Sequence, residues 1–559
     1  MSDHSHTLAS RGWIAAIGLL IAAKAALLVT YALRARWVMD EFAQGYSSRL
    51  LDAGLYTKVD PIKTVLPLFV FRLPYEWTSS ATHILTAWRV ETLLAAVLLA
   101  ACVALATWRI RGSAVAALVA TLVVLSFSNF MERAFRVRND SFAVLPAMVA
   151  LVVLLGDRET PRKAWLVGFL SGMAFLCTQK SIYFVAAFGL GLWVSGWSSG
   201  RWRGAMATLS RYAAGAGLPL LAYCVAFGGA RFDRVLTAVF LSPLQPGFST
   251  AFAHPGLGRY VVQTLERNAF VYLLCGIGLA TAFVHWRRSE PRLRAAALTT
   301  AVVTVGVFLH SQPWPYVFVM AMPFLAVWAP FPLPLTPQRF RATVLFVIVV
   351  SLSFSFLRNV TYLNEDETAQ FEVVRTAESL LGRKDRYFDG IGMIPTREIA
   401  GRHPWWWWDA PMLEILRERW NAGDRTEIER ILNDHPKVWI LNYRFRPMAP
   451  ILAPIWQAGT VRVSPYLLVS GRQATGRTSV NFENLWPGTY DLFDAQGGRM
   501  KGKLRVDGSL CELPCSISTG RHDVTTDRNA FLLPVDFQGR GPIPYRGGAP
   551  DLFAEIYDF

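Results

Sequence analysis

The sequence predicts a polytopic α-helical membrane protein whose C-terminal region is soluble. The 559-residue chain is 53% hydrophobic and only 17% charged, which makes it more apolar and less charged than an ordinary soluble domain. Up to residue 357 the apolar residues fall in long blocks, whereas a helix of a soluble protein shows an apolar stripe on one face. Beyond residue 358 the chain becomes polar, and short alternating runs replace the blocks.

The first apolar block, from Trp13 to Leu33, is about as long as the hydrocarbon core of a bilayer is thick. It is too long for the core of a signal peptide, and no small-residue cleavage site follows it, so we expect a retained transmembrane helix. Lys24 lies halfway along this block, and we expect its charge to face the interior of a helix bundle. About eleven spans are predicted in all, because similar blocks recur at 86–107, 113–130, 141–155, 164–178, 181–197, 208–229, 269–285, 295–310, 316–331 and 342–357.

The charges of the connecting loops predict the orientation of the chain. Five connections hold thirteen Lys and Arg against three Asp and Glu, and they read TWRIRG, GDRETPRK, SGRWRG, WRRSEPRLR and TPQRFR. By the positive-inside rule these loops are cytoplasmic, so we expect a cytoplasmic N-terminus and a C-terminal region on the opposite side. These loops contribute to the net charge of +16, and this charge would attract the chain to anionic membrane lipids. Since no soluble basic patch carries aromatic platforms, the sequence argues against a nucleic-acid partner.

Two regions follow the predicted membrane domain. In the first, 358–476, the segment EIERILNDHPKVWILNY predicts a helix, a turn and a buried strand. In the second, 477–559, short alternating runs interrupted by Pro-Gly and Gly-Gly predict a small β-sandwich. The run Trp405–Trp408 is open to two interpretations, because it could anchor the region at the membrane interface or stack against a sugar.

Cys511 and Cys515 lie close together in the last region. A metal site would need further ligands, and none stands nearby in the sequence, so we expect a local disulfide. A disulfide implies an oxidising compartment, which agrees with the orientation that the loop charges predict.

An acidic pair, Asp40 and Glu41, follows the first predicted span in RWVMDEFAQGY. Phe42, Tyr46 and Leu50 recur at helical spacing after it, which predicts a short helix lying on the membrane surface. An Asp before a helix and a Glu in its first turn have a structural explanation as capping residues. The alternative is an acid–base role.

Other charged and polar residues lie in loops that are predicted to share one side of the membrane with this pair. Charges beside a bilayer are costly and tend to mark functional sites. Lys and Arg hold phosphate groups, and carboxylates supply acid–base chemistry. The pattern therefore indicates group transfer from a lipid phosphate. The residues are Lys58, Asp60, Lys63, Arg133, Arg136, Arg138, Asp140, Lys180, His310 and Tyr316.

Over about residues 10–330 this layout resembles the GT-C membrane glycosyltransferases, and most closely the branch of the protein O-mannosyltransferases and the lipid A aminoarabinose transferase. Asp40–Glu41 matches the acidic pair that follows the first span of that family. Lys63 in IKTVLP stands where the family often has Lys-Pro-Pro, with Thr-Val in place of the first prolines. The remaining matches are Arg138-Asn139-Asp140 to an Arg-x-Asp element, Thr178-Gln179-Lys180 to a Thr-Lys element with an inserted Gln, and Tyr316 with Pro323 to a late Tyr and Pro.

The resemblance implies an inverting glycosyltransferase of the bacterial inner membrane. Such an enzyme would move one monosaccharide from a polyprenyl-phosphate donor to a periplasmic envelope glycan or glycolipid. Asp40, with Glu41, would be catalytic. Lys58, Lys63, Arg138 and Lys180 would bind the donor phosphate, and Asp140, His310 and Tyr316 would support the acceptor. A divalent cation, Mg²⁺ or Mn²⁺, could be held by Asp40, Glu41 and Asp140.

A non-catalytic transporter or flippase of polyprenyl-linked sugar is the alternative function. Such a protein should show internal inverted repeats and paired broken helices near the bilayer midplane. The sequence shows neither clearly, and its charges gather at one face. We therefore favour the transferase.

Overall fold

The computed structural model describes residues 2–52, 54–56, 64–156, 161–197, 202–241, 256–401, 410–538, 542 and 552–553. The chain divides into two compact units. The first comprises Met1–Ala35, Leu50–Arg72 and Trp88–Glu365, and the second comprises Arg36–Arg49, Leu73–Ala87 and Asp366–Phe559. The predicted membrane domain includes 36–49 and 73–87, whereas by their contacts these two segments group with the second unit.

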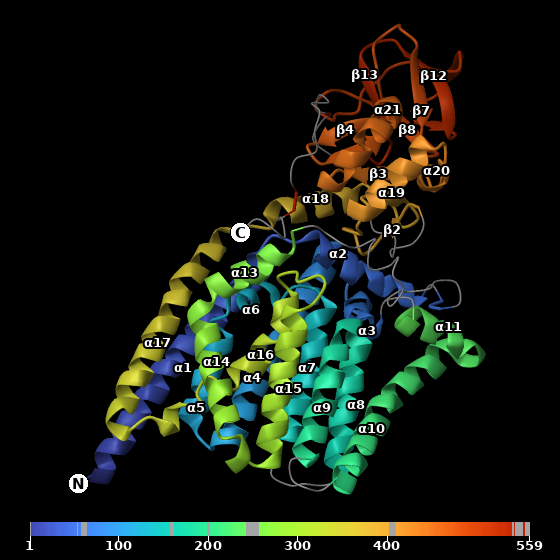
Figure 1. The fold of residues 1–559 in the computed structure, drawn as a ribbon. Coiled ribbons are helices and arrows are strands. Elements are labelled where there is room, and N and C mark those ends of the chain that lie inside the picture. The colour runs from blue at the N-terminus through green and yellow to red at the C-terminus, as the bar shows by residue number, and fades with distance from the viewer. Residues whose placement is uncertain are drawn as a thin grey trace. The chain divides into compact units, whose positions relative to one another are not determined.

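The first unit is a bundle of helices (Figure 1). Its longer helices are α1 (Ser2–Arg34), α4 (Ala81–Arg111), α5 (Ala114–Val124), α7 (Asn139–Leu154), α8 (Pro161–Cys177), α9 (Ile182–Trp197), α10 (Trp202–Gly228), α13 (Gly258–Arg267), α14 (Ala269–Val284), α15 (Pro291–Phe308) and α17 (Gln338–Val360), of which α4 begins in the second unit. Shorter helices are α3 (Leu66–Arg72), α6 (Ser128–Arg133), α11 (Phe232–Leu236) and α16 (Met322–Ala326).

Small residues let two of these helices pack backbone against backbone. A Cβ atom on Gly168 of α8 would lie 2.0 Å from the carbonyl oxygen of Tyr212 in α10, and one on Gly215 of α10 would lie 2.0 Å from that of Trp165. Side chains at these glycines would push the helices apart. Close approach through small residues is the usual packing of membrane helices, where no hydrophobic effect drives association.

Three helices among the described residues are long and apolar enough to cross a bilayer: Gly12–Arg34, Ala81–Arg111 and Gln338–Val360. The pair α13 and α14, bent by 86°, could make a fourth span. The chain is therefore a multi-pass membrane protein, but the count of eleven spans is not confirmed and stays a prediction. One reason is that the predicted block 113–130 contains two helices, α5 and α6, because the chain turns between Leu125 and Phe127.

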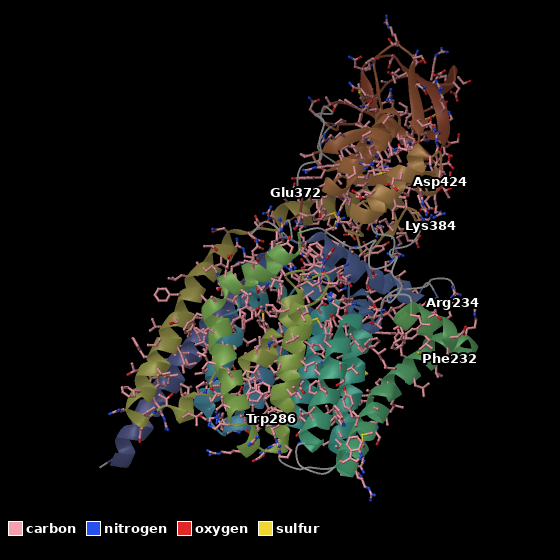
Figure 2. The ribbon with its side chains drawn as sticks, viewed as in Figure 1. Phe232, Arg234, Trp286, Glu372, Lys384 and Asp424 are labelled. Carbon is pink, nitrogen blue, oxygen red and sulfur yellow. A yellow bond between two sulfur atoms is a disulfide. The ribbon has the colours of Figure 1, made fainter. Side chains whose placement is uncertain are left out.

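Residues from the two kinds of predicted loop lie near different ends of this bundle. Figure 2 shows Trp286, in the basic connection WRRSEPRLR, at one end of the helices, and Phe232 and Arg234 of α11 toward the other end. The separation is compatible with loops that face opposite sides of a membrane. The orientation of the termini stays a prediction.

The second unit contains a five-stranded sheet with the strand order β2-β1-β3-β5-β4. β1 pairs in parallel with β2 and β3, while β5 is antiparallel to both β3 and β4. The predicted helix, turn and buried strand are confirmed as α20 (Thr426–Asn433) and β3, whose residues are all buried. The other elements of this part are β1 (Arg386–Phe388), β2 (Glu398–Ile399), β3 (Pro436–Ile440), β4 (Thr460–Ser464), β5 (Leu467–Ser470), α18 (Thr368–Ser379), α19 (Ala410–Asn421) and α21 (Ala449–Gly459).

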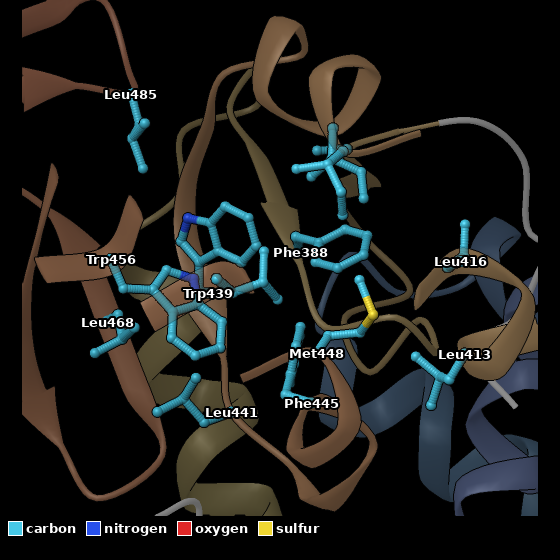
Figure 3. Packing of buried hydrophobic residues seen from close by; sticks show 14 residues of the cluster. Phe388, Leu413, Leu416, Trp439, Leu441, Phe445, Met448, Trp456, Leu468 and Leu485 are labelled. Carbon is cyan, nitrogen blue, oxygen red and sulfur yellow. The ribbon is translucent and has the colours of Figure 1, made fainter. Parts of the chain in front are cut away.

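A cluster of aromatic and aliphatic side chains forms the core around this sheet (Figure 3). Trp439 of β3 lies at its centre, with edge-to-face contacts to Phe388 of β1 and Trp456 of α21 at centroid distances of 5.3 and 5.9 Å. Such contacts add to the stabilisation that burial of the rings provides.

The predicted β-sandwich is confirmed as two four-stranded sheets, β10-β9-β12-β7 and β11-β8-β13-β6. A disulfide joins Cys511 and Cys515 beside the sandwich core. Lys437 of β3 connects the sandwich to the five-stranded sheet, because its buried ammonium group lies 3.0 Å from Asp385 Oδ2 and 2.6 Å from Asp536 Oδ2. The strands are β6 (Arg472–Ala474), β7 (Val480–Asn484), β8 (Gly488–Phe493), β9 (Leu504–Val506), β10 (Ser509–Cys511), β11 (Cys515–Ile517), β12 (Gly520–Thr526) and β13 (Ala530–Pro534).

Candidate functional site

Two cations, a carboxylate and a tyrosine meet in the first unit, and we call them the Asp140 cluster: Arg138, Asp140, Lys180 and Tyr316. Asp140 accepts hydrogen bonds from Arg138 Nε and from Lys180 Nζ, both at 3.2 Å, through different carboxylate oxygens. The guanidinium carbon of Arg138 lies 3.4 Å from the centroid of the Tyr316 ring, and Lys180 Nζ lies 4.5 Å from it. Four residues that the sequence singled out therefore form one cluster.

The local structure explains how these side chains are placed. Arg138 is the N-cap residue of α7, with extended backbone angles, and Asp140 lies in the first turn of that helix. A carboxylate at this position is favoured by the partial positive charge of a helix N-terminus. Lys180 lies in a short 3₁₀ turn, Gln179–Ser181, between α8 and α9. Tyr316 precedes the 3₁₀ turn Val317–Met320.

A histidine–tyrosine pair lies near the cluster. Nδ1 of His310 is 2.9 Å from the hydroxyl oxygen of Tyr183, and their rings meet edge to face. His310 was predicted, whereas Tyr183 was not. The signal for Tyr183 was its place three residues after Lys180, at the start of α9, where both side chains can reach the same end of the helix.

The other arginines of the second predicted outer loop are buried in a separate network. Both carboxylate oxygens of Glu132 accept from the guanidinium group of Arg267, at 2.5 and 3.3 Å, and Arg136 Nε donates to the Glu132 carbonyl oxygen. Arg133 and Arg136 are 5% and 3% exposed. Buried ion pairs of this kind set geometry more than they add stability. Sequence reasoning missed Glu132 and Arg267, because 135 residues separate them.

Lys24 is buried and donates to Ser355 Oγ, at a distance of 2.6 Å. The expectation that this charge faces the interior of the bundle is confirmed. Its partner lies on α17, far along the chain.

The acidic pair lies on α2 (Met39–Tyr46), which belongs to the second unit. Glu41 is fully buried, and its Oε2 accepts a hydrogen bond from the backbone N–H of Val38 at 3.0 Å, as in a capping box. Asp40 lies beside it in the first turn and is partly exposed. The approach of Asp40 to the Asp140 cluster stays a prediction.

The apolar face of α2 is buried in the protein and does not face lipid, and the place of this helix at the membrane surface stays a prediction. Phe42 is fully buried, with its ring centroid 4.9 Å from that of Trp37 and 5.8 Å from that of Phe553. Tyr46 is 3% exposed. The helical spacing was read correctly, but it did not reveal whether lipid or protein covers the face.

Asp389 lies at the carboxyl end of β1 in the second unit and is fully buried. Its carboxylate accepts hydrogen bonds from the backbone N–H groups of Ile391, Gly392 and Met393 at 2.9, 2.8 and 2.6 Å. Burial disfavours the charged form and outweighs these bonds, which raises the pKa of Asp389 from 3.8 to about 6.

This shift predicts a pH dependence of stability. Since folded Asp389 keeps its proton to a higher pH than in the unfolded chain, the free energy of unfolding falls as the pH rises from about 4 to about 6 and is constant above. A shift of this size corresponds to roughly 3 kcal/mol. We expect Asp389→Asn to remove this part of the pH dependence, measured as thermal unfolding midpoints below and above the window.

Asp494→Asn is the matched control for that experiment. The Asp494 carboxylate also accepts backbone N–H groups, those of Gln496 and Gly498, but at an exposed turn. An equal change in the pH dependence of both variants would contradict the assignment to Asp389.

Several predicted residues lie outside the described residues: Lys58, Asp60, Lys63 and Trp405–Trp408. Their predicted roles stay predictions.

The predicted divalent cation finds little support in this part of the chain. Among the described residues, no group of three or more His, Cys, Asp or Glu is placed to hold a metal ion. Both oxygens of Asp140 already contact cations, which disfavours a further positive ion there. One Glu41 oxygen caps α2. The divalent cation therefore stays a prediction, and we derive no step through a metal.

The fold is similar to those of known membrane enzymes. No protein-family model and no curated protein sequence matches the chain. ArnT from Cupriavidus metallidurans in the apo state aligns with a TM-score of 0.54 and 14% identity, over 82% of this chain and 98% of that chain. The same protein bound to undecaprenyl phosphate aligns with a TM-score of 0.53 and 12% identity over the same shares.

An oligosaccharyltransferase from Archaeoglobus fulgidus, in complex with Zn and sulfate, aligns with a TM-score of 0.46 and 10% identity, over 80% of this chain and 72% of that chain. The alignments with the two ArnT structures span most of both chains. The chain therefore has the fold of the GT-C membrane glycosyltransferases.

Proposed function

We propose that this protein is a glycosyltransferase that moves one monosaccharide from a polyprenyl-phosphate carrier to a glycan or glycolipid of the bacterial envelope, at the outer face of the inner membrane. The observation that carries the proposal is the Asp140 cluster, which sets two cations around one carboxylate in a chain with the GT-C fold. One structure with this fold, ArnT, is described with undecaprenyl phosphate bound.

The cluster suits a phosphate that gains charge during the reaction. Arg138 and Lys180 together carry one more positive charge than Asp140 balances. The Tyr316 ring stacks against Arg138 and holds the guanidinium plane in place. Fixed cations of this kind stabilise charge as it develops on a leaving phosphate, which is the electrostatic part of catalysis. Asp140 then acts as the residue that sets the spacing of the two cations.

Asp40 is proposed as the general base. It takes the proton from an acceptor hydroxyl, and the hydroxyl oxygen attacks the anomeric carbon from the face opposite the phosphate. The new carbon–oxygen bond forms as the bond to the phosphate oxygen breaks, and the electron pair leaves with the lipid phosphate. The configuration of the sugar is inverted. A partly exposed carboxylate is suited to this role, because it needs only hydrogen-bond reach to the hydroxyl.

Reconstitution tests the proposal against the transporter alternative. The purified protein is placed in vesicles with polyprenyl-phosphate sugars and envelope glycolipids extracted from cells of the source bacterium that lack it, and the glycolipids are analysed by mass spectrometry. We expect a product heavier by one monosaccharide residue. Movement of the lipid-linked sugar between leaflets without product would overturn the proposal and support a flippase.

A further inference from the structure

The five-stranded sheet of the second unit has an edge of the kind that usually binds ligands. β1 is flanked by two parallel strands, β2 and β3, and the segments that follow β1 and β3 leave from the same edge. In α/β proteins, ligands bind outside the carboxyl ends of the strands, where neighbouring connections diverge. Asp389 and Asn442 mark this edge, and the Asn442 side chain donates to the Asp389 carbonyl oxygen at 2.8 Å.

The helix α2 of the same unit packs at this edge. The backbone of Gly392 lies so close to Tyr46 that a Cβ atom there would be 2.5 Å from the tyrosine ring. The Tyr46 hydroxyl donates to the Arg397 carbonyl oxygen at 3.0 Å and accepts from the Ile399 N–H at 2.9 Å. Arg444, on the segment after β3, places its Nε 2.9 Å from the sulfur of Met39, at the other end of the helix. Loops from both parallel strands therefore hold α2.

A second contact fixes the chain just before α2. The buried Gln370 side chain of α18 accepts from the backbone N–H of Trp37 at 2.7 Å and donates to the Trp37 carbonyl oxygen at 2.9 Å. It thus pairs both polar backbone groups of one residue, as a neighbouring strand would. Trp37 stands three residues before Asp40. The helix is therefore held just before its N-terminus, by Gln370, and at its C-terminal residue, Tyr46.

We infer that the soluble α/β region is a clamp for the acidic helix, and that Tyr46 and Gln370 are positioning residues for Asp40. The inference rests on the proposed role of Asp40 as the base. A helix of eight residues is short and stiff, so a shift at either anchor moves the Asp40 carboxylate as well. A displacement of about 1 Å from a reacting group can lower a rate by about a hundredfold.

Tyr46→Phe is the most informative variant. It keeps the ring against Gly392 but removes the hydroxyl that bridges Arg397 and Ile399. Tyr387→Phe is its matched control, because the buried Tyr387 hydroxyl also bridges a carbonyl oxygen and an N–H group, both of Ile394. Each variant loses the same kind of bridge, but only Tyr46 lies on α2.

Gln370→Glu tests the second anchor independently. A carboxylate keeps an acceptor for the Trp37 N–H but loses the donor to the Trp37 carbonyl oxygen. Glu372→Gln is the control on the same helix, where Glu372 is exposed (Figure 2).

The variants are compared as full-length protein in vesicles, with the extracted polyprenyl-phosphate sugars as donors. We expect Tyr46→Phe and Gln370→Glu to lower kcat by about tenfold or more with little change in KM. Tyr387→Phe and Glu372→Gln should change kcat less than about threefold at a comparable thermal midpoint. Hydrogen exchange of the backbone amides of residues 39–46 should be faster in the first two variants only.

The outcomes separate the clamp from the proposed function. Equal effects of Tyr46→Phe and Tyr387→Phe on kcat and on exchange would overturn the clamp while Asp40 remained the base. If Tyr46→Phe fails to fold, Gln370→Glu decides the same question. If Asp40→Asn is fully active, the proposed base is wrong, and the clamp is then judged by the exchange of residues 39–46 alone.

Discussion

Asp40→Asn is expected to abolish sugar transfer and to leave the protein folded and able to bind its lipid donor. The amide has the size of the carboxylate but cannot take a proton from the acceptor hydroxyl. Loss of a general base typically lowers the rate by about 10²- to 10⁴-fold. The loss of a favourable charge in the first turn of α2 should itself cost about 0.3–1 kcal/mol of stability.

The measurement is kcat for transfer in vesicles, together with the affinity for undecaprenyl phosphate as the lipid probe. Asp52→Asn is the matched control, since Asp52 lies in the same predicted outer loop and makes an ion pair with Arg72 at 2.9 Å. A surface pair of this kind contributes at most about 1 kcal/mol. Full activity of Asp40→Asn, or an equal loss in Asp52→Asn, would show that Asp40 is not the base.

Arg138→Met is expected to have the second largest effect, and to act on donor binding. The variant keeps an unbranched, flexible stem without the charge and leaves Lys180 to balance Asp140. It removes the planar cation that stacks on Tyr316. A hydrogen bond to a charged group contributes about 1.5–3 kcal/mol, so the affinity for the lipid phosphate should fall by about ten- to a hundredfold.

Binding of undecaprenyl phosphate and the KM for the extracted donor lipids measure this effect. Arg72→Gln is the control, because it removes an arginine from the Asp52 pair in the outer loop. Arg138→Lys should recover only part of the affinity, since an ammonium group cannot reproduce the stacking or the fork of donors. Unchanged affinity in Arg138→Met would remove this residue from the phosphate site.

Local sequence was sufficient wherever neighbours along the chain decide the structure. The contact between Arg138 and Asp140 spans two residues, and the helix and buried strand at α20 and β3 follow from periodicity over a few turns. The disulfide follows from two cysteines four residues apart. Such features depend on short-range geometry, which the order of residues specifies directly.

The sequence did not predict contacts between residues that lie far apart along the chain. Lys180 donates a hydrogen bond to Asp140, 40 residues away in the sequence, and Lys24 donates one to Ser355, 331 residues away. The number of spans was also uncertain from hydropathy, because an apolar block does not reveal where a helix breaks, as between α5 and α6.

By itself the sequence determined the apolar helices, the C-terminal α/β and sandwich regions, and which charged residues were candidates for a site. Only the tertiary structure decided which candidates meet. It brought Arg138, Asp140, Lys180 and Tyr316 together, and it buried the apolar face of α2 in protein, where the sequence had predicted lipid. The physical reason is that amphipathic spacing fixes which side of a helix is apolar, whereas the partner for that side is chosen by packing of distant segments.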